Sequence, residues 1–195
     1  MNVLAPIMAL VGVVVGAGLS FIFTFTVERR KERWTLDREW RERKLRAYST
    51  FLADIKRMRD LAQRIAAAVG LDDQAPPMDR ETGMEHLAEA NMARSASFET
   101  VNLIAGRPVV EAGRQLNRAV WRLEWFARGF LDDADHKGWA TAFRAYHAAI
   151  NHFHECARLD VGVSGEFSPR STEPSPRVQY EKDRAARNSS TTDPG

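Results

Sequence analysis

Three histidines and the only cysteine gather near the end of the chain's last predicted helix: His147, His152, His154 and Cys156. A zinc site needs four such ligands around one point, or three and an open position. Residues four or seven apart share a helix face, so His152 pairs with Cys156, and His147 pairs with His154. These are two half-sites rather than one closed site. We therefore expect no metal and no other cofactor.

Two short motifs resemble catalytic signatures, but each departs from the pattern that the chemistry needs. His-Glu-Cys-Ala-Arg at 154–158 begins like a zinc-protease helix, yet Arg158 stands where the second ligand histidine is required. Gly-Val-Ser-Gly at 162–165 places its second glycine one position too early for a nucleophile elbow, and no strand precedes it. Phosphate-binding glycine loops are also missing from the sequence. We predict no catalytic residue and no enzymatic activity.

Asp132, Asp133 and Asp135 stand beside His136 and could form a cation site or an acid–base pair. Acids that directly precede a helix more often accept hydrogen bonds from its free N–H groups and complement its dipole. We expect these aspartates to be helix caps.

The chain begins with an apolar segment in which no side chain from Met1 to Val27 is charged. About 20 such residues span the hydrocarbon core of a bilayer as a helix. A cleaved signal peptide would instead place basic residues before a shorter apolar run, whereas here they follow it. We predict a single transmembrane anchor over residues 1–27.

The anchor's orientation follows from the charges after it. Residues 28–46 hold nine basic and five acidic side chains, which predicts an outside N-terminus and a cytoplasmic body. The basic side chains next to the anchor must lie at the level of the lipid headgroups: Arg29, Arg30, Lys31 and Arg33. The Trp34 indole is a further candidate for headgroup contact. Trp34 also fits the start of the apolar stripe of the next helix, and we favour that core position for it.

Three small residues, Gly12, Gly16 and Ser20, follow one face of the predicted anchor at four-residue spacing. Such a row lets two membrane helices approach closely enough to pack. Because glycine is common in membrane helices, chance is the alternative. A homodimer through this face is therefore a hypothesis.

The rest of the chain predicts an all-α protein. Acid–base pairs at four-residue spacing indicate that the anchor continues as a solvated helical stalk over residues 28–44. Four amphipathic segments then predict an up-and-down antiparallel bundle over residues 45–161. Their apolar stripes include Leu45 to Val69, Met84 to Ala105, Val109 to Phe130 and Trp139 to Ala157. Residues 162–195 are rich in Ser, Pro and Gly and predict a disordered tail.

The order of these segments resembles that of actinobacterial single-span membrane proteins with a cytoplasmic helical domain and no assigned activity. The resemblance is carried by Leu-Arg-Ala-Tyr-Ser-Thr-Phe-Leu at 45–52, Pro-Val-Val-Glu-Ala at 108–112 and Ala-Arg-Leu-Asp-Val-Gly-Val at 157–163. It covers most of residues 1–163. These are packing patterns, so the resemblance implies the architecture and no chemistry.

A net charge of +2 is too small to indicate nucleic-acid binding. An anchor, a stalk and a bundle without a catalytic motif favour a membrane-tethered scaffold that binds an unknown protein partner. The alternative is a bundle that senses a small ligand or signal, with Asn91, Asn102 and Asn117 lining a pocket between the helices. A polar cavity would favour the sensor, and a packed core with an exposed apolar patch would favour the scaffold.

Overall fold

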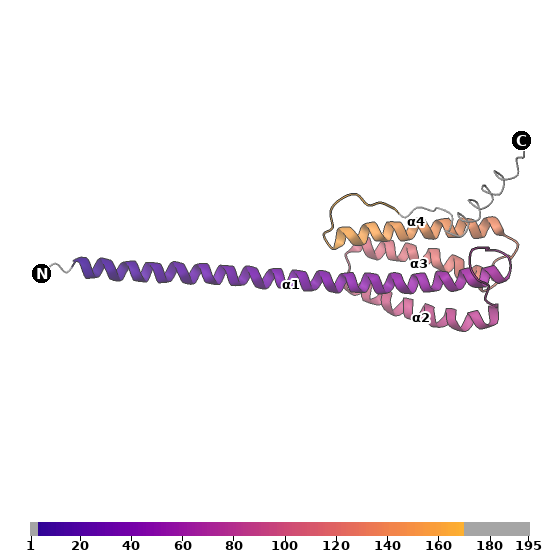
Figure 1. Ribbon diagram of the computed structural model, residues 1–195, viewed down its shortest axis with the longest axis horizontal. Coiled ribbons are helices and arrows are strands. Elements are labelled where there is room, and N and C mark those ends of the chain that lie inside the picture. Colours follow the sequence, from indigo (N-terminus) through magenta and orange to yellow (C-terminus); the bar gives the residue numbers. More distant parts are fainter. Residues whose placement is uncertain (1–3, 170–195) are drawn as a thin grey trace, which may run out of the picture. The chain divides into compact units, whose positions relative to one another are not determined.

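The computed structural model describes residues 4–169, with side chains for Trp34 and residues 36–169. All regular structure in this part of the chain is helical, which confirms the all-α prediction (Figure 1). The four helices are α1 (Leu4–Ala68), α2 (Arg80–Ile104), α3 (Arg107–Ala127) and α4 (His136–Asp160). The chain divides into two compact units, Met1–Arg43 and Lys44–Gly195, and α1 contributes to both.

The helices of the second unit begin and end where the local chemistry favours it. Asp79 accepts a hydrogen bond from the Thr82 N–H at 2.8 Å and caps α2, and Asp135 caps α4 in the same way. Pro108 lies in the first turn of α3, where its missing N–H is not needed. Gly70, just after α1, has a φ of 82°, which glycine adopts without strain. Of these ends, the cap at Asp135 is among those that the sequence predicts.

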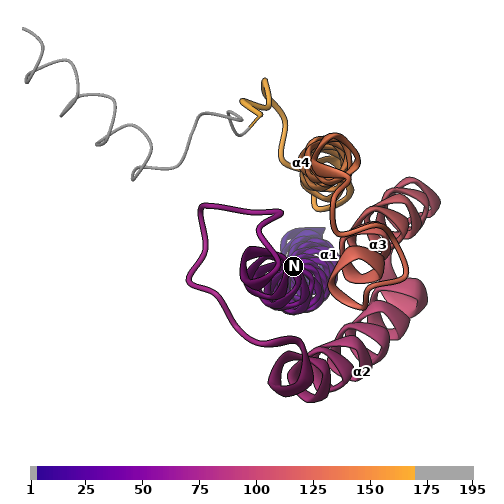
Figure 2. The same cartoon turned by 90° about the vertical axis from the view of Figure 1, so that its right-hand side faces the viewer.

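Successive helices of the second unit run in opposite directions (Figure 1). Only Ala105 and Gly106 separate α2 from α3, and so short a connection makes the two helices antiparallel neighbours. Figure 2 shows α2, α3 and α4 in an arc around the part of α1 that belongs to this unit, with α3 in the middle of the arc. The predicted four-helix bundle is thus observed.

One apolar core fills the space between these helices. The Phe51 ring of α1 lies 5.1 Å from Phe98 of α2 and 5.3 Å from Phe153 of α4, measured between centroids. Phe126 of α3 meets Trp139 of α4 edge to face at 5.7 Å. Burying each large apolar side chain contributes about 1.5–3 kcal/mol, so this core is the main source of the unit's stability.

Three apolar residues that the sequence places in the core are exposed instead. Trp34, Leu45 and Phe130 are 75%, 52% and 71% exposed, respectively. Trp34 belongs to the first unit, whereas the core is formed by the second. Leu45 lies to one side of the buried stripe, which is centred on Phe51. Phe130 follows Gly129, whose φ of 73° ends the helical periodicity of α3. The predicted core position of Trp34 is therefore wrong.

The residues that the structure describes include no helix long and apolar enough to cross a membrane. The backbone of α1 begins at Leu4. The side chains of the predicted span, residues 1–27, lie outside the described ones. Residues 170–195 of the predicted tail also lie outside the described part of the chain. The anchor, its orientation and the disordered tail stay predictions.

Asp160 connects three helices at the end of α4. Its carboxylate accepts hydrogen bonds from Lys44 Nζ at 2.8 Å, from the Tyr48 hydroxyl and from the Gly106 N–H at 3.2 Å. Burial disfavours the charged carboxylate, but the donors from Lys44 and Tyr48 and the charge of Lys44 hold the pKa of Asp160 below its usual range. One side chain thereby joins α1, the α2–α3 corner and α4.

Candidate functional site

The histidines and the cysteine of α4 do not form one site. Among the described residues, no three His, Cys, Asp or Glu side chains converge as metal ligands would. His152 Nε2 lies 3.8 Å from Cys156 Sγ, while the His154 ring stacks on Phe167 and the His147 ring lies 5.2 Å from that of Phe143. Burial, followed by the charge of Glu155, raises the pKa of the Cys156 thiol. A thiol held in its protonated form is a poor nucleophile and a poor metal ligand.

The aspartates between α3 and α4 accept hydrogen bonds that shape the loop. Asp135 caps α4, as described above, and Asp132 accepts from the Ala134 N–H at 2.9 Å. Asp133 accepts from Arg80 Nη2 at 2.7 Å, and Arg80 Nε donates to the Ala127 carbonyl at the end of α3. Arg80 thereby ties the start of α2 to the turn after α3. The predicted cap is confirmed for Asp135, whereas Asp133 pairs with an arginine.

Most of the predicted membrane-contact residues have side chains that lie outside the described ones. These residues are Gly12, Gly16, Ser20, Arg29, Arg30, Lys31 and Arg33. Trp34 is the exception, and its indole is exposed. Contact of Trp34 with the lipid headgroups therefore remains a prediction, whereas its predicted position in the core is wrong.

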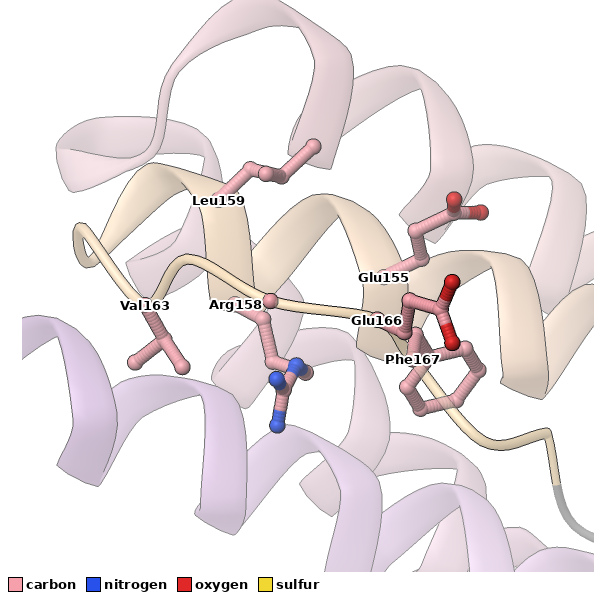
Figure 3. A pocket seen from close by; sticks show the side chains of 7 residues that line it. Glu155, Arg158, Leu159, Val163, Glu166 and Phe167 are labelled. Atoms are coloured by element: carbon pink, nitrogen blue, oxygen red, sulfur yellow. The ribbon is translucent and has the colours of Figure 1, made fainter.

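A shallow pocket of about 330 Å³ lies between the last turns of α4 and the segment that follows it. Figure 3 shows the segment running back along α4, with Glu155 and Arg158 on the helix and Glu166 and Phe167 on the segment. Two glutamates and one arginine give this pocket little preference for either sign of charge. We assign no function to it.

A groove with a volume of about 360 Å³ lies on the surface between α2 and α3. From α2 it is lined by Arg94, Ser95, Phe98 and Glu99. From α3 it is lined by Arg114, Asn117, Arg118 and Trp121. Three arginines and two aromatic rings therefore share one surface site, which we call the α2–α3 groove.

Arg94 lies at the base of this groove and is only 5% exposed. Its Nη1 donates to Asn117 Oδ1 of α3 at 2.6 Å. Its Nη2 and Nε donate to Asn91 Oδ1, one turn earlier on α2, at 2.8 and 3.2 Å. The guanidinium carbon lies 5.2 Å from the centroid of the Trp121 ring, which is within cation–π range.

No carboxylate of the described residues forms an ion pair with Arg94. Glu124 acts on it through its charge, but Glu124 is itself buried and paired with Arg128, with its Oε1 2.6 Å from Nη2. Burial lowers the pKa of Arg94, and the charge of Glu124 only partly opposes this. An arginine remains charged at neutral pH even so. The groove therefore holds a buried cation whose hydrogen-bond partners are neutral amides.

Close contact between the two helices shapes one end of the groove. Gly113 of α3 faces the edge of the Phe98 ring, and a Cβ atom added there would lie 2.5 Å from Phe98 Cε2. Real Cβ atoms essentially never come so close, so a larger residue would force the ring to shift. Phe98 is half-buried and lines the groove at this contact.

The sequence identifies part of this groove. Asn91, Asn102 and Asn117 are predicted as polar residues on inner faces. Asn91 and Asn117 both bind Arg94, but of the three only Asn117 lines the groove. Arg94 itself is missed, although Leu87, Ala90, Arg94, Ser97 and Val101 follow one another at helical spacing and are all buried. A charged residue within a buried stripe is the signal that could have revealed it.

Comparison of the chain with protein-family models, with curated proteins and with solved structures found no match. The resemblance to actinobacterial single-span proteins therefore stays an expectation.

Proposed function

We propose that the chain is a helical interaction module that residues 1–27 hold at the cytoplasmic face of a membrane. In this proposal its bundle binds a protein partner through the α2–α3 groove. One observation carries the proposal. Arg94, which is buried without an ion-pair partner, shares one surface site with exposed arginine and tryptophan side chains.

The composition of the groove supports partner binding. Tryptophan and arginine are among the residue types enriched in the side chains that dominate binding energy at protein interfaces. Trp121 is 37% exposed, and Trp125, one turn later on α3, is 43% exposed. Arg122 lies over the Trp125 ring at 5.9 Å. The outer face of α3 thus continues the aromatic and basic character of the groove beyond its margin.

The interior of the bundle also favours the scaffold over the sensor. Large apolar side chains from all four helices fill the core, and the groove opens at the surface instead of between the core faces. Asn117 is the one predicted pocket residue that is fully buried, and its oxygen already binds Arg94. A ligand would therefore bind to the outside of the bundle.

A photo-crosslinker tests this proposal in the intact membrane protein. Benzoylphenylalanine placed at Glu99, in the groove, should give a discrete crosslinked product in the cells that produce the protein. The same residue placed at Ala145, exposed on α4, is the matched control. Trp121→Ala should abolish the Glu99 product. Equal products from both positions, or a product unaffected by Trp121→Ala, would refute the groove as the partner site.

The sensor remains the second candidate, because Arg94 could bind a small anion by itself. Thermal unfolding of the full chain in detergent, with and without millimolar acetate or phosphate, separates the two candidates. A small-anion sensor should be stabilised in proportion to the logarithm of the anion concentration above its Kd. A protein-binding module should show no such increase at matched ionic strength.

A further inference from the structure

We propose that the α2–α3 groove binds an acidic segment of a partner protein, whose carboxylate pairs with Arg94 and Arg118 while a neighbouring apolar side chain packs against Trp121 and Phe98. This inference rests on the proposed function and specifies the chemistry of the partner.

Arg94 has hydrogen-bonding capacity that Asn91 and Asn117 do not use. A guanidinium has five N–H donors in one plane, and among the described residues three bonds to Asn91 and Asn117 use three of them. Nη1 and Nη2 each keep one further N–H. The guanidinium carbon lies over the Trp121 ring, 5.2 Å from its centroid. A carboxylate accepts hydrogen bonds from arginine in the guanidinium plane, so it matches the donors that remain.

The lining of the groove carries an excess of positive charge. Arg94, Arg114 and Arg118 contribute three positive charges to the lining, and Glu99 contributes the only negative one. The next acids along α3 are already occupied, since Glu111 pairs with Arg107 at 2.8 Å and Glu124 with Arg128. Leaving a buried cation without a counter-charge is unfavourable. An anionic ligand would supply that charge and would exclude water from the ion pair.

The size and the surface of the groove fit part of a larger partner. A groove of about 360 Å³ lies at the lower end of the range for ligand pockets, which suits one or two side chains of a larger partner. Trp121 and Phe98 line it beside the arginines and offer apolar surface. A segment that carries an acid next to an aromatic or aliphatic residue would use both kinds of surface at once.

Fluorescence anisotropy tests the inference with two labelled peptides, Gly-Glu-Phe-Glu-Glu-Phe-Glu-Gly and the same peptide with every Glu replaced by Gln. The protein is the full chain in nanodiscs of zwitterionic lipid. We expect the Glu peptide to bind roughly tenfold or more tightly than the Gln peptide, because charged hydrogen bonds are worth that much. Added salt should weaken the binding.

Variants locate the binding on the molecule. Arg118→Gln, at an exposed position, should weaken Glu-peptide binding several-fold without affecting the fold, and Arg94→Gln should weaken it more. Arg144→Gln, exposed on α4 outside the groove, is the matched control and should leave binding unchanged. Circular dichroism of each variant checks that the helices remain intact.

Several outcomes would overturn the inference. These are no binding of the Glu peptide, equal binding of the Glu and Gln peptides, or equal losses from Arg118→Gln and Arg144→Gln. Displacement of the peptide by millimolar inorganic phosphate, or tighter binding of the protein to vesicles containing anionic lipid through Arg118, would identify a different anion as the ligand. The crosslink from Glu99 is independent of these results, so it can support the proposed function even where the acidic peptide fails.

Discussion

Arg94 occupies a position where an apolar residue would ordinarily stand. It follows Leu87 and Ala90 on the buried face of α2 and precedes Val101 on the same face. Placing a guanidinium there costs desolvation energy, and the neutral amides of Asn91 and Asn117 offset only part of it. Residues that lower stability in this way are typical of binding sites, where activity depends on a group that the fold itself does not need.

Arg94 and Asn117 should depend on each other for their effect on stability. Arg94→Met alone should lower the free energy of unfolding by about 1–3 kcal/mol, because the buried Asn117 oxygen loses its partner. Arg94→Met combined with Asn117→Leu should return stability to within about 1 kcal/mol of the original, since both polar groups are then replaced by apolar ones. Denaturant unfolding of the full chain in detergent measures both variants. If the loss of stability in the double variant equals the sum of the losses in the two single variants, the Arg94–Asn117 pair is needed for folding.

Asp160 is the opposite case, a charged residue that stabilises the fold. Its pKa is lowered in the folded state, so its contribution is complete above the unfolded pKa of about 3.9 and is lost as the pH falls through the folded value. Asp160→Asn should cost about 1–3 kcal/mol at neutral pH. This difference should shrink as the pH falls below about 3.9 and through the lower pKa of the folded state. Unfolding curves at several pH values check it, and a difference independent of pH would contradict it.

At the scale of the elements, close contact between α1 and α2 limits what the helices can accept. Gly83 lies against the fully buried Ile65, and a Cβ atom added to Gly83 would lie 2.5 Å from Ile65 Cγ1. Helix propensity alone favours alanine over glycine by about 1 kcal/mol. The contact opposes this preference, because a closely packed core has no room for another methyl group.

We expect Gly83→Ala to destabilise the bundle by about 1–3 kcal/mol, despite its higher helix propensity. Ile65→Ala removes the obstructing atoms and should itself cost about 2–5 kcal/mol. The double variant should be more stable than the sum of the two losses predicts, because the new methyl group fills the space left by Ile65. A double-mutant cycle measures this coupling. Strict additivity would mean that the two helices move apart easily.

At the scale of the whole molecule, the proposed role depends on the predicted anchor. The apolar run over residues 1–27 and the basic residues after it predict a membrane protein with an outside N-terminus and a cytoplasmic bundle. A bundle held at the membrane meets its partner in a thin layer, which raises the effective concentration of a weakly bound ligand.

The full chain should therefore stay with the membrane fraction after an alkaline wash, and deletion of residues 1–27 should release it. A green fluorescent protein fused to the C-terminus should fluoresce, and an alkaline phosphatase fused there should be inactive, because the two reporters function on opposite sides of the membrane. An active phosphatase fusion would show that the C-terminus lies outside, which is the reverse of the predicted orientation. A soluble full chain would rule out the anchor.

Much of the bundle can be predicted from the sequence, because its determinants are local. The caps at Asp79 and Asp135, Pro108 in the first turn of α3 and the apolar spacing of Leu116, Val120 and Leu123 depend on neighbours within a turn or two. Such patterns specify helices and their inner faces before any packing occurs. They are less reliable at the ends of a stripe, as the exposed Leu45 and Phe130 show.

The groove depends on tertiary structure, because its parts are far apart in the sequence. The sequence by itself determined the all-α class, the order of the helices and most of the residues that each one buries. Only the packed bundle brought Arg94 to Asn117 and Trp121 and joined Asp160 to Lys44 and Gly106. A helical stripe reports which residues turn inward, but the partner that a buried polar residue meets depends on how neighbouring helices align, and that is decided when the whole core packs.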